Sequence, residues 1–260
     1  MFLVKLTEFE PLLDSTYFLA LYSNNNAHVK FTPGKLFLIV SNRFPNFIAT
    51  LQLSPRWFTN FSVDHVHSSK VSLESFHDAM LDGGEFSTMS IHLLDKTNQM
   101  ILRFDTPSSQ IQPLHRELTL SPPQSEDDRI GQHELNLQKF FIVTSKSLRR
   151  VIKELPIFQN DSIICVCVTA SQIKFSIASH DIVFSEGDHC RIEGFEEEVE
   201  TQFQINLCPM LFFLNFTYRA SRVWFYKTKN NAYTVMMVPA FGIYGQYAIY
   251  FPTTYMCMAK

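Results

Sequence analysis

The clearest pattern of apolar and charged positions in this chain lies between residues 146 and 155. Four apolar residues recur at the spacing of one helix face, namely Leu148, Val151, Ile152 and Leu155. Four cations recur at helical spacing on the opposite face, namely Lys146, Arg149, Arg150 and Lys153. The segment therefore predicts an amphipathic helix with an apolar face for the core and a basic face. That basic face is either an ordinary solvated surface or a surface for an anion, and the spacing leaves both open.

Three other segments begin in the same way as this helix. In each, an apolar residue precedes one that favours the cap of a helix, and the four pairs are Leu6-Thr7, Val71-Ser72, Val143-Thr144 and Ile205-Asn206. Thr7 and Glu10 also have the spacing of a capping box. The similar intervals between these starts predict four related units, two in each domain. We expect helices over 7–22, 72–81, 146–155 and 206–218.

Segments with strand composition follow every predicted helix. In the first half they are HVKFT, KLFLIVS, FIATLQL, FTNFSV, STMSIHLL and QMILRFD, and in the second half SIICVCV, QIKFSIA, DIVFS, RVWFYKT, AYTVMMV and YAIYFP. Their β-branched and aromatic residues predict an antiparallel, sheet-rich fold. On the helices, we expect the apolar stripes to face the core, including Phe9, Leu13 and Tyr17, and Leu207, Met210, Leu214 and Tyr218.

A polar segment separates the two halves. SPPQSEDDRIGQHELN, residues 121–136, contains prolines and acids without sustained periodicity, which is typical of a linker. We therefore expect one domain over 1–120, a connector over 121–136 and a second domain over 137–260. The acidic run between Glu193 and Glu200 is expected to be a solvated loop.

Composition narrows the class of protein. With 260 residues and 46% apolar content the chain is long enough for a folded core, and we expect an α+β protein. The net charge of −3 excludes a nucleic-acid binder that relies on overall basicity, but allows a local basic patch. Five cysteines without a C-x-x-C pair predict reduced thiols, with no disulfide and no zinc. Without a signal peptide or a long apolar run, we expect a soluble, intracellular protein with no membrane partner.

Few residues are candidates for catalysis. The sequence has no phosphate-binding glycine loop, no G-x-S-x-G and no H-E-x-x-H. His65 and His67 could share one face of a strand as metal ligands, but they lack matching partners, and a polar loop is the preferred reading. Asp188, His189 and Cys190 resemble a nucleophile site in composition only. We therefore expect neither an enzyme nor a cofactor.

The arrangement as a whole is similar to a known family. Two halves, each with two helices and many strands and joined by a polar linker, extend from MFLVKL to YAIYFP. In this plan the chain resembles the DNA sliding clamp superfamily, which includes proliferating cell nuclear antigen. The resemblance implies two tandem clamp domains, each with two helices packed on antiparallel sheets. It also implies a ring of three subunits, with the helices lining a hole that holds duplex DNA.

The resemblance assigns roles to particular residues. The basic helix would line the hole and contact phosphates of double-stranded DNA without sequence preference, through Lys146, Arg149, Arg150 and Lys153, joined by Arg219. Partner proteins would bind a pocket under the connector at positions that resemble the family's, namely Val40, Ile249, Phe251 and Pro252. Phe251 is larger than its family counterpart, so its ring could fill that pocket. A clamp loader and repair or checkpoint proteins are the further partners implied.

Several features favour the checkpoint form of such a clamp. The helix predicted over 7–22 carries acids and no Lys or Arg, and three identical copies would repel DNA. SNRFPNFIATLQLSPRWFTNF and KVSLESFHDAM look more like the Rad-nine subunit of the heterotrimeric checkpoint clamp, and the replicative family's apolar connector motif is absent. The long phosphorylated tail of Rad-nine proteins has no counterpart before Lys260, so kinase activation through it is not implied.

These features lead to an expected assembly and location, with two alternatives. We expect a nuclear subunit that assembles with two related subunits. The first alternative is a divergent replicative homotrimer that confers polymerase processivity. The second is a β-rich interaction scaffold without DNA contact.

Overall fold

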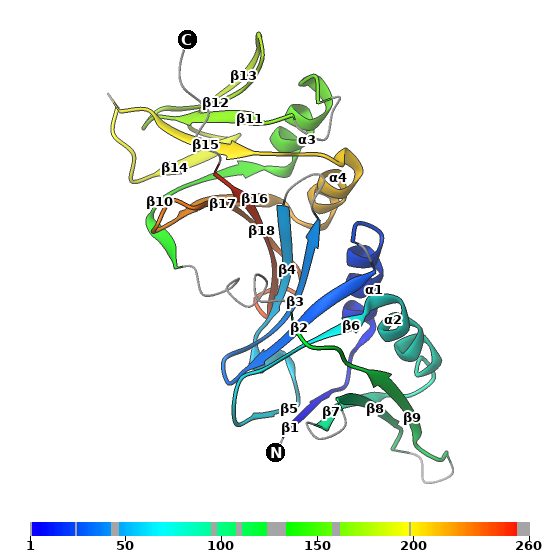
Figure 1. The fold of residues 1–260 in the computed structure, drawn as a ribbon. Helices are drawn as coiled ribbons and strands as arrows, with labels where there is room; N and C mark the ends of the chain where they lie inside the picture. The colour runs from blue at the N-terminus through cyan, green and yellow to red at the C-terminus, as the bar shows by residue number, and fades with distance from the viewer. Residues whose placement is uncertain are drawn as a thin grey trace. The chain divides into compact units, whose positions relative to one another are not determined.

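The computed structural model describes two compact units (Figure 1). The described residues are 2–23, 25–42, 47–94, 98–107, 111–123, 134–157, 162–197 and 199–253. Unit 1 contains Met1–Ser41, Thr50–Ile130 and Phe241–Gln246, and unit 2 contains Asn42–Ala49, Gly131–Ala240 and Tyr247–Lys260. Each unit therefore includes a short segment from the opposite half of the chain. Most of the connector expected over 121–136 lies outside the described residues.

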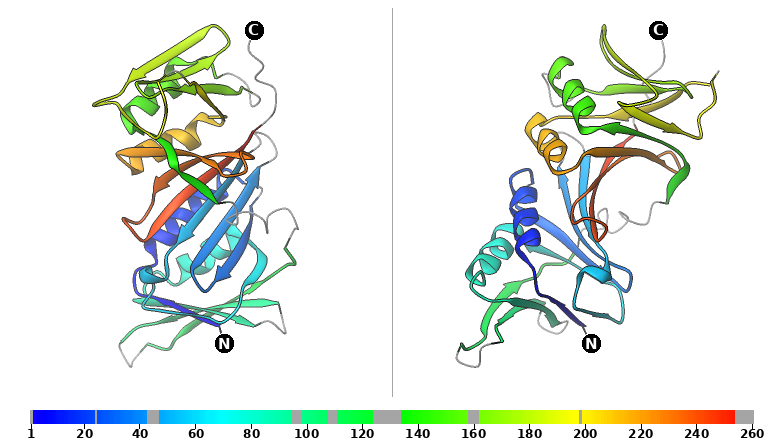
Figure 2. Two further views of the ribbon diagram at one scale, coloured as in Figure 1. Left: turned by 90° about the vertical axis from the view of Figure 1, so that its left-hand side faces the viewer. Right: turned by 180° about the vertical axis from the view of Figure 1, so that it is seen from behind.

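The first half of the chain alternates single helices with groups of strands. Its elements are β1 (Phe2–Leu6), α1 (Glu10–Ala20), β2 (Asn26–Thr32), β3 (Lys35–Asn42), β4 (Phe47–Leu53), the short 3-10 helix η1 (Pro55–Trp57), β5 (Asn60–Val63), β6 (His67–Ser72), α2 (Leu73–Asp82), β7 (Thr88–Leu94), β8 (Gln99–Asp105) and β9 (Leu114–Thr119). One antiparallel sheet has the strand order β5-β1-β7-β8-β9. The other four strands of this half are hydrogen-bonded neighbours in the order β4-β3-β2-β6. In unit 1, α1 packs beside α2 (Figure 2).

The second half repeats this order of elements. It contains β10 (Leu135–Thr144), α3 (Ser145–Glu154), β11 (Ile164–Val168), β12 (Gln172–Ile177), β13 (His180–Ser185), β14 (Cys190–Glu193), β15 (Thr201–Ile205), α4 (Met210–Arg219), β16 (Arg222–Thr228), β17 (Tyr233–Pro239) and β18 (Gly245–Pro252). One antiparallel sheet has the strand order β13-β12-β11-β15. The other strands of this half are hydrogen-bonded in the order β14-β10-β16-β17-β18. The α+β class expected from the sequence is confirmed.

Aromatic rings fill the interior of unit 2. Phe141 on β10 stacks on Phe225 of β16 with ring centroids 4.7 Å apart, and its edge meets Phe203 of β15 at 5.0 Å. All three side chains are at most 1% exposed. These phenylalanines therefore stabilise the sheet-on-sheet core of unit 2.

The predicted helix caps are correct for two of the four helices. Ser72 and Thr144 cap α2 and α3, each accepting a hydrogen bond from the backbone N–H three residues later. Thr7 does not cap α1, because that helix begins at Glu10, where Pro11 in the first turn favours its start. Asn206 does not cap α4 either. Its side chain accepts a hydrogen bond from the backbone N–H of Cys208, and α4 begins at Met210.

The apolar stripes expected along α1 and α4 were correct only in part, since Phe9 and Leu207 are buried but other members are not. Tyr17, Tyr218 and Met210 are 54%, 67% and 41% exposed, although each was expected to face the core. The buried residues are Leu12, Phe18 and Leu19 on α1, and Phe212, Phe213 and Phe216 on α4. Both helices carry apolar residues around most of their circumference, so more than one stripe satisfies helical spacing.

Candidate nucleic-acid interface

Helix α3 presents its two faces as its sequence predicts. The N-cap Thr144 fixes the start of the helix directly after β10, and α3 packs on β10 and β16. Leu148, Val151 and Ile152 are at most 1% exposed, so the apolar face is buried in the core. On the opposite face Lys146, Arg150 and Lys153 are exposed, and Arg149 is half-buried. The four cations therefore form a basic face on the surface of unit 2.

Helix α4 extends this basic face. The Arg149 guanidinium lies over the ring of Tyr218 at 5.0 Å from its centroid, a cation–π contact between the two helices. Arg219, in the last turn of α4, is also exposed. The structure thus brings Arg149 to α4 and leaves Arg219 next to the exposed Tyr218. Sequence reasoning missed Tyr218, because it assigned this ring to the core.

Arg150 has an intrahelical partner. Its Nε donates to Glu154 Oε2 at 2.9 Å, one turn further along α3, and both side chains are more than half exposed. Exposed pairs at this spacing contribute about 0.3–0.5 kcal/mol. An approaching phosphate therefore competes with Glu154 at little cost. The basic face, which we define as Lys146, Arg149, Arg150 and Lys153, remains available to an anion.

The two helices of unit 1 have the opposite charge. Glu10 and Asp14 on α1 and Glu74 and Asp78 on α2 are exposed, and neither helix contains Lys or Arg. Tyr17 on α1 packs on His77 of α2 with ring centroids 5.4 Å apart. The helices of the two units therefore present opposite electrostatic surfaces to solvent.

The residues expected to bind partner proteins are mostly buried. Val40, Ile249 and Phe251 are at most 4% exposed, and only Pro252 is half-exposed. The Phe251 ring contacts Phe213 at 5.9 Å and Phe47 at 6.4 Å within unit 2. Three of the four side chains are therefore part of the buried apolar interior of the units that contain them.

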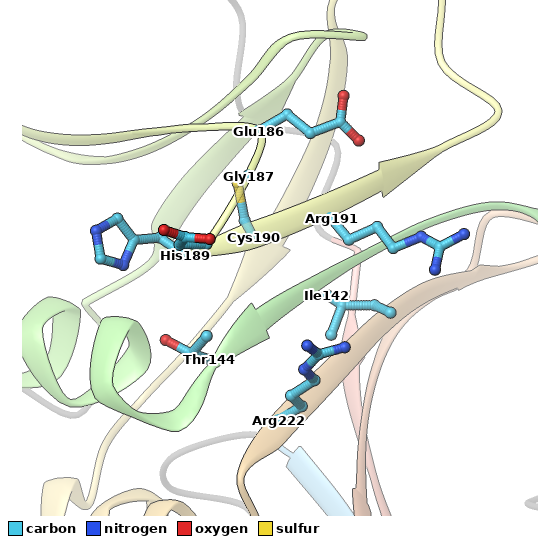
Figure 3. Close-up of a pocket in the computed structure, with 9 residues that line it drawn as sticks. Ile142, Thr144, Glu186, Gly187, His189, Cys190, Arg191 and Arg222 are labelled. Carbon is cyan, nitrogen blue, oxygen red and sulfur yellow. The ribbon is translucent and has the colours of Figure 1, made fainter.

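A cavity of about 300 Å³ lies in unit 2 beside the start of α3 (Figure 3). Its wall includes the loop between β13 and β14, the first residue of β14, Cys190, and further side chains of β10, β14 and β16. The Cys190 thiol donates to the carbonyl oxygen of Ser185 at 3.1 Å, and burial, followed by the nearby Glu186 carboxylate, raises its pKa to about 11. The His189 ring points away from the sulfur (Figure 3). Cys190 therefore lacks the low pKa and the adjacent base of an activated nucleophile.

The other candidate histidines have local partners. His67 lies at the start of β6, and its Nε2 is 3.2 Å from Ser69 Oγ. Within the described ranges, no three His, Cys, Asp or Glu side chains lie close enough to share a metal ion. Nor does the described part contain a helix with the length and apolar character needed to cross a membrane.

No protein-family model matches this chain, and a search of curated proteins gives no match either. The function is therefore inferred from the residues and their geometry.

Proposed function

We propose that this protein is a subunit of a DNA sliding clamp of the checkpoint type, which encircles duplex DNA and recruits repair or checkpoint proteins. The observation that carries the proposal is the exposed basic face of α3, held in place by a buried apolar face and by the Thr144 cap. The repeated order of elements in the two halves of the chain supports a clamp built from two related domains.

The chemistry of the basic face suits a protein that slides. Lysine and arginine contact phosphates without reading the bases, and Arg149, stacked on Tyr218, is pre-oriented for such a contact. Binding of this kind depends on the release of counterions, so it weakens steeply with added salt. A contact that is indifferent to base sequence allows the subunit to move along the duplex.

The acidic helices of unit 1 favour a ring of different subunits. Exposed carboxylates on α1 and α2 repel DNA, so the other members of the ring supply the missing positive charge. The assembly then contains this chain and two related subunits, requires a loader to open it and acts in the nucleus.

The test compares the basic face with a matched set of cations from three strands and a turn of unit 2. In the first variant Lys146, Arg149, Arg150 and Lys153 become Gln, and in the control Lys139, Arg191, Arg222 and Lys229 become Gln, which gives the same change in net charge. Binding to a fluorescent DNA duplex is followed by polarisation as the salt concentration is raised. For wild type we expect a log–log salt slope of about −4, because each phosphate contact contributes about −0.9.

The two variants should separate clearly. The basic-face variant should bind weakly with a slope near zero, whereas the control should keep most of the wild-type slope. Equal binding by wild type and the basic-face variant, or an equal loss in both variants, would contradict the proposal.

A further inference from the structure

A cluster of exposed and half-buried side chains, most of them aromatic, lies in unit 1. It joins η1 to the turn between β17 and β18, and we call it the aromatic patch: Arg56, Trp57, Phe241, Ile243 and Tyr244. Ile243 is 86% exposed and Tyr244 is 40% exposed. Single exposed apolar residues are common, but a group around a tryptophan at a turn is typical of an interaction site.

The patch is rigid. Trp57 stacks on Phe241 with ring centroids 5.1 Å apart and planes inclined by 25°. The backbone N–H of Ser54 donates to Tyr244 O at 2.7 Å, and that of Tyr244 donates to Phe241 O at 3.0 Å. Gly242 has a φ of +60°, which lets the chain turn tightly and present Ile243. A partner would therefore meet a preformed surface and pay little ordering entropy.

The patch continues towards a free sheet edge. Trp57 contacts Phe58, and Phe58 contacts Phe61 of β5, with both pairs of ring centroids 5.1 Å apart. β5 is the terminal strand of its sheet and pairs only with β1 among the described strands. No described strand pairs with its outer edge, and the edge of a sheet is a common place for an extended peptide to add as a further strand.

The charge around the patch favours an acidic partner. Arg56 is exposed and forms no ion pair within the described residues. Neither 54–60 nor 239–246 contains Asp or Glu, so the two segments that form the patch carry one positive charge and no carboxylate side chain. Trp, Tyr and Arg are also the residues most enriched where binding energy is concentrated in protein interfaces.

We propose that the aromatic patch and the edge of β5 bind an extended, acidic and apolar segment of a partner protein. An apolar side chain of the segment rests against Trp57 and Ile243, and its acids pair with Arg56. A peptide fits better than a lipid surface, because Trp57 and Phe241 stack flat and half-buried while Ile243 alone protrudes strongly. This inference does not depend on DNA binding by α3.

The experiment uses the full chain and a fluorescein-labelled synthetic peptide that alternates Glu with Leu and Phe. A second peptide with Lys in place of Glu tests the charge preference. The protein variants are Ile243→Asp and Arg56→Glu, both at exposed positions, so they should leave the fold intact. Val199→Asp is the matched control, because Val199 is an exposed apolar residue of a unit 2 loop.

We expect the acidic peptide to bind wild type and Val199→Asp alike, and to bind each patch variant about tenfold or more weakly. The Lys peptide should bind poorly. Equal binding by wild type and both patch variants would overturn the proposal. A second contradicting outcome is that the peptide does not bind and that wild type, but not Ile243→Asp, sediments with phosphatidylserine vesicles. A third is that wild type self-associates and that Ile243→Asp abolishes this self-association.

DNA titration keeps this test separate from that of the proposed function. Both patch variants should bind duplex DNA as wild type does. A loss of peptide binding with intact DNA binding would therefore support the patch alone.

Discussion

At the scale of single residues, Cys190 shows how its surroundings set the reactivity of a thiol. Its side chain is 4% exposed, and the Sγ–H donates to the carbonyl of Ser185. Burial favours the neutral thiol and raises its pKa to about 11, whereas a free thiol has a pKa of about 8.5. The folded protein therefore holds this proton more tightly than the unfolded chain does. The resulting stabilisation is complete below the unfolded pKa and is lost as pH rises through the folded value.

Alkylation tests this environment. With iodoacetamide at neutral pH, the peptide that contains Cys190 should remain unmodified in the native protein, and modification should rise only as pH approaches 11. Mass spectrometry of the digested protein gives the modified fraction. The same protein in guanidinium is the control, because Cys190 should then react near pH 8. Rapid labelling of native Cys190 at pH 7 would show that the thiol is neither buried nor protonated.

At the scale of elements, the sequence predicted those helices whose residues point to one arrangement. On α3 the four cations leave a single apolar stripe, so its buried face could be identified, and Thr144 lies at its start. On α4 the run MLFFLNFTYR offers several apolar stripes, and only packing selects Phe212, Phe213 and Phe216. The edge strand β9 was missed because it is largely polar, and β14 because two of its four residues are charged.

The caps offer a direct test of these element boundaries. Thr144→Ala removes the side chain that accepts from the Ser147 N–H, so it should lower the free energy of unfolding by about 1 kcal/mol. Thr144→Ser should keep most of that stability. Thr7→Ala is the matched control: it lies before α1 without capping it, and its effect should stay within about 0.5 kcal/mol. Urea unfolding measures all three, and an equal loss for Thr7→Ala would place the start of α1 at Thr7 after all.

At the scale of the whole molecule, the sequence predicted the repeated order of elements but not how the compact units divide the chain. Helix spacing and strand composition are local, so they revealed one helix followed by several strands, four times. The short segments that each unit takes from the opposite half depend on long-range packing, which local patterns do not record. The burial of Val40 and Ile249 was missed for the same reason, whereas the size of Phe251 had suggested that its ring could fill space.

The charge of the two helix pairs leads to a prediction about assembly. A homotrimeric ring around DNA would contain three copies of the acidic α1 and α2 surfaces as well as three basic faces. The carboxylates of α1 and α2 would repel the DNA phosphates and would also repel one another. A ring with two different partners avoids this, because those partners can carry basic residues at the corresponding positions. The purified chain should therefore be a monomer near 30.1 kDa by native mass spectrometry and sedimentation, including in the presence of duplex DNA. A stable trimer of this chain alone would favour a replicative clamp, and it would require counterions or partner proteins to offset the carboxylates of α1 and α2.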